Sequence, residues 1–198
     1  MLGCLLFPLL VYLLPRPATG QIPTQPNAST AIVFYADRDV RETIWPTLFD
    51  AFHHELVREE REYPLPEDAQ LIRASSLAPG QEFTRVIDVR LIGRCDVVQQ
   101  AYRPMRRGPV GWVLKVSGEI QPFVYVDCAR LAQFLNPVTL GMNEEQRRTA
   151  MTHAISRIAI HEWIHIDTQS ADHKNHGIRK EELAPDDLTV GLRASGGQ

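Results

Sequence analysis

The apolar residues between positions 143 and 166 repeat at the spacing of an α-helix. From Ala150 onward they recur every three or four positions, and the pattern continues through Trp163 and Ile166. This periodicity predicts one long, largely buried helix. Asn143 followed three residues later by Gln146 forms a loose capping box, which is a start signal for such a helix. We therefore expect the helix to begin just after Asn143.

Apolar runs in the first part of the chain have instead the length and composition of strands. Residues 31–35 are almost all apolar and predict a strand buried on both faces. A second helix is expected over residues 41–61, where the apolar side chains fall on one side. The further predicted strands are residues 71–74, 83–92, 112–116 and 120–126, the last two joined as a hairpin by Ser117 and Gly118. These elements predict an α+β fold in which a mixed β-sheet packs on two long helices.

Pro122 lies within the last predicted strand. Proline has no N–H to donate to a ladder, so it is tolerated mainly in a strand at the edge of a sheet. We therefore expect this strand to lie at an edge, with one side open, just before the long helix in the sequence.

The N-terminal segment has the pattern of a secretory signal peptide. Residues 5–14 form an apolar run, and Ala18-Thr19-Gly20 is a small-residue site of the kind that signal peptidase cuts, here before Gln21. The run is too short to span a membrane. We expect a secreted or periplasmic protein with no stable membrane span after cleavage. The predicted organisation is a signal peptide over residues 1–20, a flexible leader over 21–30 and one domain over 31–198.

Charge and cysteine content narrow the picture. The chain has 24 acidic and 21 basic residues, a formal net charge of −3, and this balance does not favour nucleic acid as a partner. Once the leader is removed, Cys95 and Cys128 remain, and both follow predicted strands. Because exported proteins form disulfides in oxidising compartments, we predict that these two cysteines pair.

The predicted helix over residues 41–61 also carries a His53-His54-Glu55 triplet. These residue types suit metal binding, but adjacent residues on a helix face different directions. We therefore interpret the triplet as a solvated flank of an amphipathic helix.

Residues 161–165 read His-Glu-Trp-Ile-His, an HExxH motif near the end of the long predicted helix. Residues four apart on a helix share a face, so His161 and His165 can offer two imidazole nitrogens to one metal ion. Zinc takes neutral imidazole readily, and a catalytic zinc site combines three protein ligands with an open position for an acidified water. Glu162, beside both histidines, would serve as the general base.

Spacing alone leaves the third ligand open. Residues 168–170 are of types that commonly end a helix, and His173 follows them closely. A short loop can thus return His173 to the metal, and Gly177 beyond it permits a tight turn. We favour His173 because imidazole is the commoner zinc ligand. The rivals are a carboxylate from Glu181 or Glu182, or from Asp172 beside His173.

The stretch from His161 to Gly177 resembles the zincin metallopeptidases, in particular the metzincin-like group in which a third histidine follows the helix. It also resembles the short HExxH…H…G tail of small exported bacterial metallopeptidases. The resemblance covers the last quarter of the chain. It implies a zincin-like domain, Zn²⁺ as cofactor on His161, His165 and His173, a catalytic Glu162, and a peptide or protein substrate.

In the mechanism that this resemblance implies, zinc polarises both the scissile carbonyl and a bound water. Glu162 takes a proton from the water and delivers it to the leaving amine. We expect His176 or Arg179 to stabilise the oxyanion. Zincins bind peptides as an added strand along the edge strand above the zinc helix. The alternative function is a non-catalytic exported binding domain that keeps a structural zinc or captures a partner peptide with its edge strand.

Overall fold

The computed structural model describes residues 30–37, 40–59, 63, 66, 69–97 and 108–190. The predicted signal peptide and nearly all of the predicted leader lie outside these residues. Thr30, which we assigned to the leader, is instead the first residue of a strand. Among the described helices none combines the length and the apolar character that a membrane span requires.

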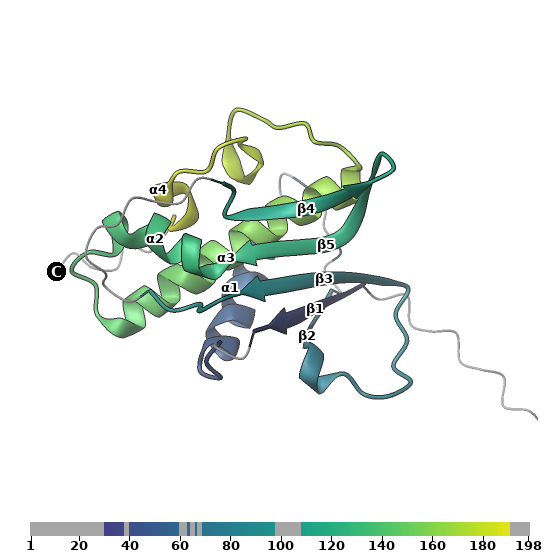
Figure 1. Cartoon of the computed structure of the whole chain (residues 1–198), viewed down its shortest axis with the longest axis horizontal. Coiled ribbons are helices and arrows are strands. Elements are labelled where there is room, and N and C mark those ends of the chain that lie inside the picture. Colours follow the sequence, from purple (N-terminus) through teal and green to yellow (C-terminus); the bar gives the residue numbers. More distant parts are fainter. Residues whose placement is uncertain are drawn as a thin grey trace, which may run out of the picture.

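Five strands form one mixed sheet in the order β2-β1-β3-β5-β4 (Figure 1). The four strands from β2 to β5 in this order are parallel, and β4 pairs with β5 in the antiparallel direction. The strands are β1 (Thr30–Ala36), β2 (Gln70–Arg73), β3 (Arg85–Ile92), β4 (Gly111–Val116) and β5 (Glu119–Asp127). The predicted class, a mixed sheet with helices, is confirmed.

Two long helices, α1 (Ile44–Glu59) and α3 (Glu144–Thr168), pack against each other and cover one face of the sheet, behind it in Figure 1. Phe34 of β1 packs among the aromatic rings of α1, and α3 lies against β5 and β4. The buried core therefore sits between the sheet and these two helices. The shorter helices are α2 (Cys128–Thr139), α4 (Pro185–Leu188) and the 3₁₀ turns η1 (Ala74–Ser76) and η2 (Gly177–Arg179).

The start of α3 is the one that its sequence predicts. The Asn143 side chain accepts from the Gln146 N–H, and the Gln146 side chain accepts from the Asn143 N–H, both at 2.9 Å. This capping box satisfies two of the donors that a helix start leaves unpaired. By contrast, α2 was not anticipated, and it begins directly after β5 with Asp127 as its cap, accepting from the Arg130 N–H at 2.9 Å.

The expectation that the Pro122 strand lies at an edge is wrong. That strand is β5, which lies between β3 and β4. Its pairing with β3 starts at Phe123, after the proline, and its register with β4 shifts between Val113 and Lys115, opposite Pro122. Because of this local irregularity, the ladder does not require a hydrogen bond from Pro122, which has no N–H to donate. The edge strand is β4.

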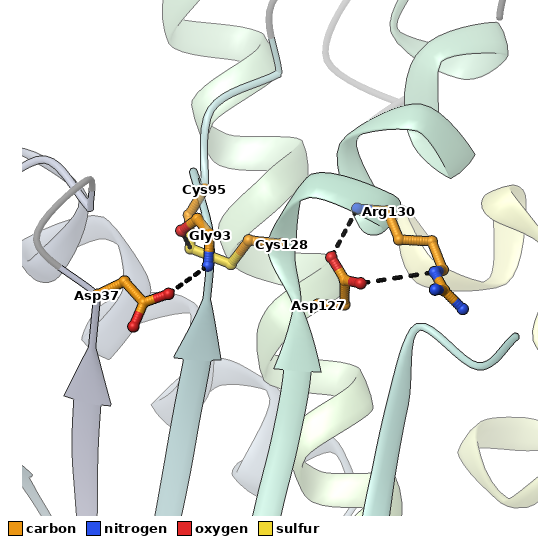
Figure 2. The surroundings of a disulfide bond; sticks show 6 residues. All are labelled: Asp37, Gly93, Cys95, Asp127, Cys128 and Arg130. Carbon is orange, nitrogen blue, oxygen red and sulfur yellow. Dashed lines mark hydrogen bonds and ion pairs between the residues drawn. A yellow bond between two sulfur atoms is a disulfide. The ribbon is translucent and has the colours of Figure 1, made fainter. Parts of the chain in front are cut away.

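The predicted disulfide between Cys95 and Cys128 is present. Cys95 follows β3, and Cys128 is the first residue of α2 immediately after β5, so the bridge joins the carboxyl ends of two parallel strands (Figure 2). Beside it, Asp37 after β1 accepts a hydrogen bond of 2.8 Å from the Gly93 N–H after β3. Three neighbouring strands are therefore tied together at this end of the sheet.

Candidate metal centre

The last turns of α3 carry the motif residues His161, Glu162 and His165 into the interior, and each is 8% exposed. The helix is buried all along this stretch, from Ala150 to Ile166 with His153 the exception. Buried polar side chains in such surroundings need partners, because desolvation otherwise costs free energy. The partners of the two histidines define the site.

Backbone carbonyls fix the tautomer of both rings. The Nδ1 atom of His161 lies 2.5 Å from the carbonyl oxygen of Ile178, and Nδ1 of His165 lies 2.7 Å from that of Ser170. A carbonyl oxygen only accepts, so each Nδ1 carries the proton and each Nε2 keeps its lone pair. The two Nε2 atoms face each other at 3.0 Å. This is the arrangement by which ligating histidines are oriented in metal sites.

Electrostatics favour a cation between these two nitrogens. Burial lowers the pKa of His161 to about 4, an effect that the hydrogen bond to Ile178 partly offsets and nearby positive charges reinforce. Burial likewise lowers the pKa of His165. Both rings are therefore neutral at pH 7, and their lone pairs repel at 3.0 Å unless a cation lies between them. The donor set thus fits a metal ion.

His173 completes the cluster from the loop after α3. Its ring centroid lies 5.3 Å from that of His161 and 4.8 Å from that of His165. One ligand nitrogen from each of the three histidines lies within 4.8 Å of the other two. Tetrahedral zinc needs separations of about 3.4 Å, and the exposed His173 is free to close the difference. Of the described residues, the rival ligands Asp172, Glu181 and Glu182 do not join this cluster.

The loop that positions His173 and the two carbonyls is held by contacts that sequence reasoning missed. Gln169 ends α3 in the left-handed conformation, at φ 50°, and its side chain exchanges hydrogen bonds of 2.9 and 3.0 Å with the backbone of Ile120 in β5. Gly177, at φ 65°, then turns the chain so that Ile178 presents its carbonyl to His161. The sequence indicated the helix end near Gln169 and the turn at Gly177, but not the hydrogen bonds to Ile120 or the role of the Ile178 carbonyl.

Glu162 occupies the side of the site next to β4. Burial raises its pKa to about 7. A Cβ at Gly111 of β4 would lie 3.5 Å from Oε1 of Glu162 and 2.1 Å from Cγ2 of Ile158. The absence of a side chain at Gly111 therefore allows the edge strand to approach the motif closely.

The two residues considered for oxyanion stabilisation are placed differently. His176 is exposed and does not belong to the histidine cluster. Arg179 is half-buried in η2, and its positive charge is among the smaller effects that lower the pKa of His161 and of His165. Arg179 thus acts electrostatically on the site.

Comparisons with known proteins add no relative: no protein-family model, curated protein or solved structure matches this chain. The site's chemistry rests on its own geometry.

Proposed function

We propose that this protein is a zinc-dependent metallopeptidase that acts outside the cytoplasm. The observation that carries the proposal is the convergence of two buried, neutral imidazole nitrogens at 3.0 Å with a third imidazole beside them. Three imidazole ligands, with a fourth position left for water, are the ligand set of a catalytic zinc. The Cys95–Cys128 disulfide supports a location in an oxidising compartment.

Zinc, when bound, would supply an acidified water and polarise the scissile carbonyl. The protein's own residues handle the protons. Glu162 takes one proton from the water as the water oxygen bonds to the carbonyl carbon. It then gives that proton to the leaving amine as the C–N bond breaks. Without the metal, burial raises the pKa of Glu162 to about 7, and a bound Zn²⁺ would lower it, which favours the carboxylate form that a general base needs. Arg179 or His176 would stabilise the negative charge on the carbonyl oxygen.

The edge strand β4 offers a place for an extended peptide. The Asp127 N–H donates to the Val110 carbonyl oxygen at 2.9 Å. Hydrogen-bonded pairs alternate along an antiparallel ladder, so the backbone groups of Gly111 and Val113 point away from β5. A substrate strand pairing with these groups would pass beside Glu162.

Replacing Glu162 with glutamine tests the catalytic part of the proposal. Glu162→Gln keeps the shape of the side chain but not the base, so zinc content should stay at the wild-type value. Hydrolysis of a broad peptide library should fall by about 10²- to 10⁴-fold. Metal analysis and the library assay on the same preparation measure both. A variant that cleaves at the wild-type rate contradicts the role of Glu162.

The third ligand is tested by comparing alanine variants. His173→Ala should lose zinc affinity by much more than Glu181→Ala or Glu182→Ala, because of these three residues only His173 lies in the cluster with His161 and His165. His176→Ala should keep the metal and lose rate. If His173→Ala keeps the wild-type zinc content while a glutamate variant loses one equivalent, a carboxylate is the third ligand instead.

The alternative is an exported binding domain whose zinc is structural and whose open β4 edge captures a peptide. The exposed apolar side chains of Leu114 and Val116 on that strand favour this second function. If the zinc-loaded wild type cleaves nothing in the library but retains peptides, this alternative takes the place of the first.

A further inference from the structure

A second cluster of potential metal ligands joins α1 and α3, away from the HExxH site. It consists of His54 and Glu55 from α1 and His153 from α3. His153 precedes His161 by eight residues on one helix, which places the two clusters about 12 Å apart along its axis. The interpretation of the His53-His54-Glu55 triplet as a solvated flank is wrong for Glu55, which is buried and lies next to His153 of α3, 98 positions further along the chain.

The ligand atoms of this second cluster have nearly the spacing of a tetrahedral site. Nδ1 of His153 lies 3.3 Å from Oε1 of Glu55, and Nδ1 of His54 lies 4.0 Å from the same oxygen. All three ligand atoms lie within 4.8 Å of one another. Zinc bonds of about 2.0–2.2 Å require ligand separations of about 3.4 Å. The His153–Glu55 pair already meets that distance, and His54, with its side chain 67% exposed, is free to swing inward.

Glu55 is held so that one of its oxygens faces the two imidazoles. Its side chain is fully buried. Arg157 donates to Oε2 at 2.7 Å, and the Arg58 guanidinium pairs with the same oxygen. Oε1 is thereby left toward His54 and His153 as a single-oxygen ligand. Such contacts to the second oxygen orient a ligating carboxylate.

The charges around the second cluster balance one another, so they do not repel a cation. Glu59 pairs with Arg58 at 3.3 Å and lies 3.6 Å from Arg157, so two carboxylates offset the two guanidiniums. The His153 side chain is 16% exposed, so its ring is largely shielded from solvent.

From this geometry we propose a second metal site, in which His54, Glu55 and His153 bind a divalent transition-metal ion of the Zn²⁺ type and clamp α1 to α3. The donor set of two imidazoles and one carboxylate oxygen is one that zinc accepts. This site is separate from the proposed catalytic centre and shares no ligand with it.

Zn²⁺ titration of the metal-free full chain tests the proposal. His54→Gln and His153→Gln should each remove one bound equivalent, or weaken it at least tenfold. His53→Gln, an exposed neighbour on the same helix that is outside the cluster, should bind as the wild type does. Calorimetry gives the stoichiometry and affinity, and circular dichroism checks that each variant is folded. His54→Gln keeps the test decisive if His153→Gln disturbs the helix packing.

The second site is identified by the variants that remove its zinc, His54→Gln and His153→Gln. Its test therefore does not depend on whether the HExxH site binds zinc. His173→Ala should remove a different equivalent and leave this one in place. The second site is refuted if neither His54→Gln nor His153→Gln changes Zn²⁺ binding. It is also refuted if His53→Gln lowers binding equally, since that result indicates adventitious surface binding.

Discussion

His161 and Glu162 are neighbours in sequence, and burial shifts their pKa values in opposite directions. The pKa of His161 falls to about 4, while that of Glu162 rises to about 7. In both cases the interior favours the uncharged side chain. Near neutral pH, the Nε2 atom of His161 therefore carries no proton that a metal ion would have to displace. In the metal-free protein, the Glu162 carboxyl group is close to its pKa at the same pH.

These shifts predict how stability depends on pH in chelator-treated protein. His161 titrates at 6.5 when unfolded and at about 4 when folded. The stability it contributes is therefore present above pH 6.5 and lost as pH falls to about 4, a change of about 3 kcal/mol. Glu162 acts oppositely: its contribution is present below its ordinary value of 4.5 and lost as pH rises to about 7.

Comparing variants isolates the His161 contribution. Between pH 7 and pH 4, His161→Gln should lose about 3 kcal/mol less unfolding free energy than the wild type, because it lacks the titrating ring. Urea unfolding at both pH values measures this difference. His53→Gln, which is exposed, serves as the control and should follow the wild type. Equal losses in His161→Gln and the wild type would show that the folded pKa of His161 is not depressed.

At the scale of elements, the site depends on how closely β4 approaches α3. Gly111 makes this approach possible, because a Cβ there would lie only 2.1 Å from Cγ2 of Ile158. Ile158 is buried and β-branched, so its χ1 rotamer on a helix is strongly restricted and it cannot easily move aside. The distance between the edge strand and Glu162 is thus set by one glycine.

We predict that Gly111→Ala lowers the unfolding free energy by about 1–3 kcal/mol through overpacking. It should also lower peptide hydrolysis, because β4 must move away from Glu162. Ile158→Ala removes the opposing methyl group, so the cost of Gly111→Ala should shrink in that background in a double-mutant cycle. Leu114→Ala, at an exposed position of β4, is the control for a change in the same strand. Additive losses in the cycle would rule out the contact as the cause.

At the scale of the whole molecule, the disulfide links the strand ends next to α2. Cys95 and Cys128 are 33 positions apart, and the bridge closes a loop that contains β4 and β5. Closing a loop of this length restricts the unfolded chain and contributes about 3–4 kcal/mol on the loop-entropy estimate.

The double variant Cys95→Ser/Cys128→Ser should lose about that much unfolding free energy while keeping its zinc, because the bridge lies at the sheet ends and not among the histidines. Denaturant unfolding and metal analysis measure the two effects. In the chain that begins at Gln21, thiol titration under denaturing conditions should find no free thiol. Two titratable thiols in protein from an oxidising compartment would contradict the bridge.

The sequence by itself determined the features that depend on local spacing. The apolar period and the Asn143 capping box predicted α3, and four-residue spacing placed His161 and His165 on one face. These follow from helix geometry, which is the same in any fold. The hairpin turn at Ser117 and Gly118, with φ of 52° and 93°, was also predictable, because a two-residue hairpin turn requires positive φ and glycine adopts it readily.

The tertiary structure alone decided features that join distant parts of the chain. Pro122 suggested an edge strand, but β5 became internal because a register irregularity absorbs the missing donor. The carbonyl of Ile178 that orients His161 has no signature, since every residue carries a carbonyl. His153 meets Glu55 only because α1 packs on α3. Which distant residues come into contact depends on how the helices and strands pack. The periodicity of side chains along one element does not indicate which residues of another element it will meet.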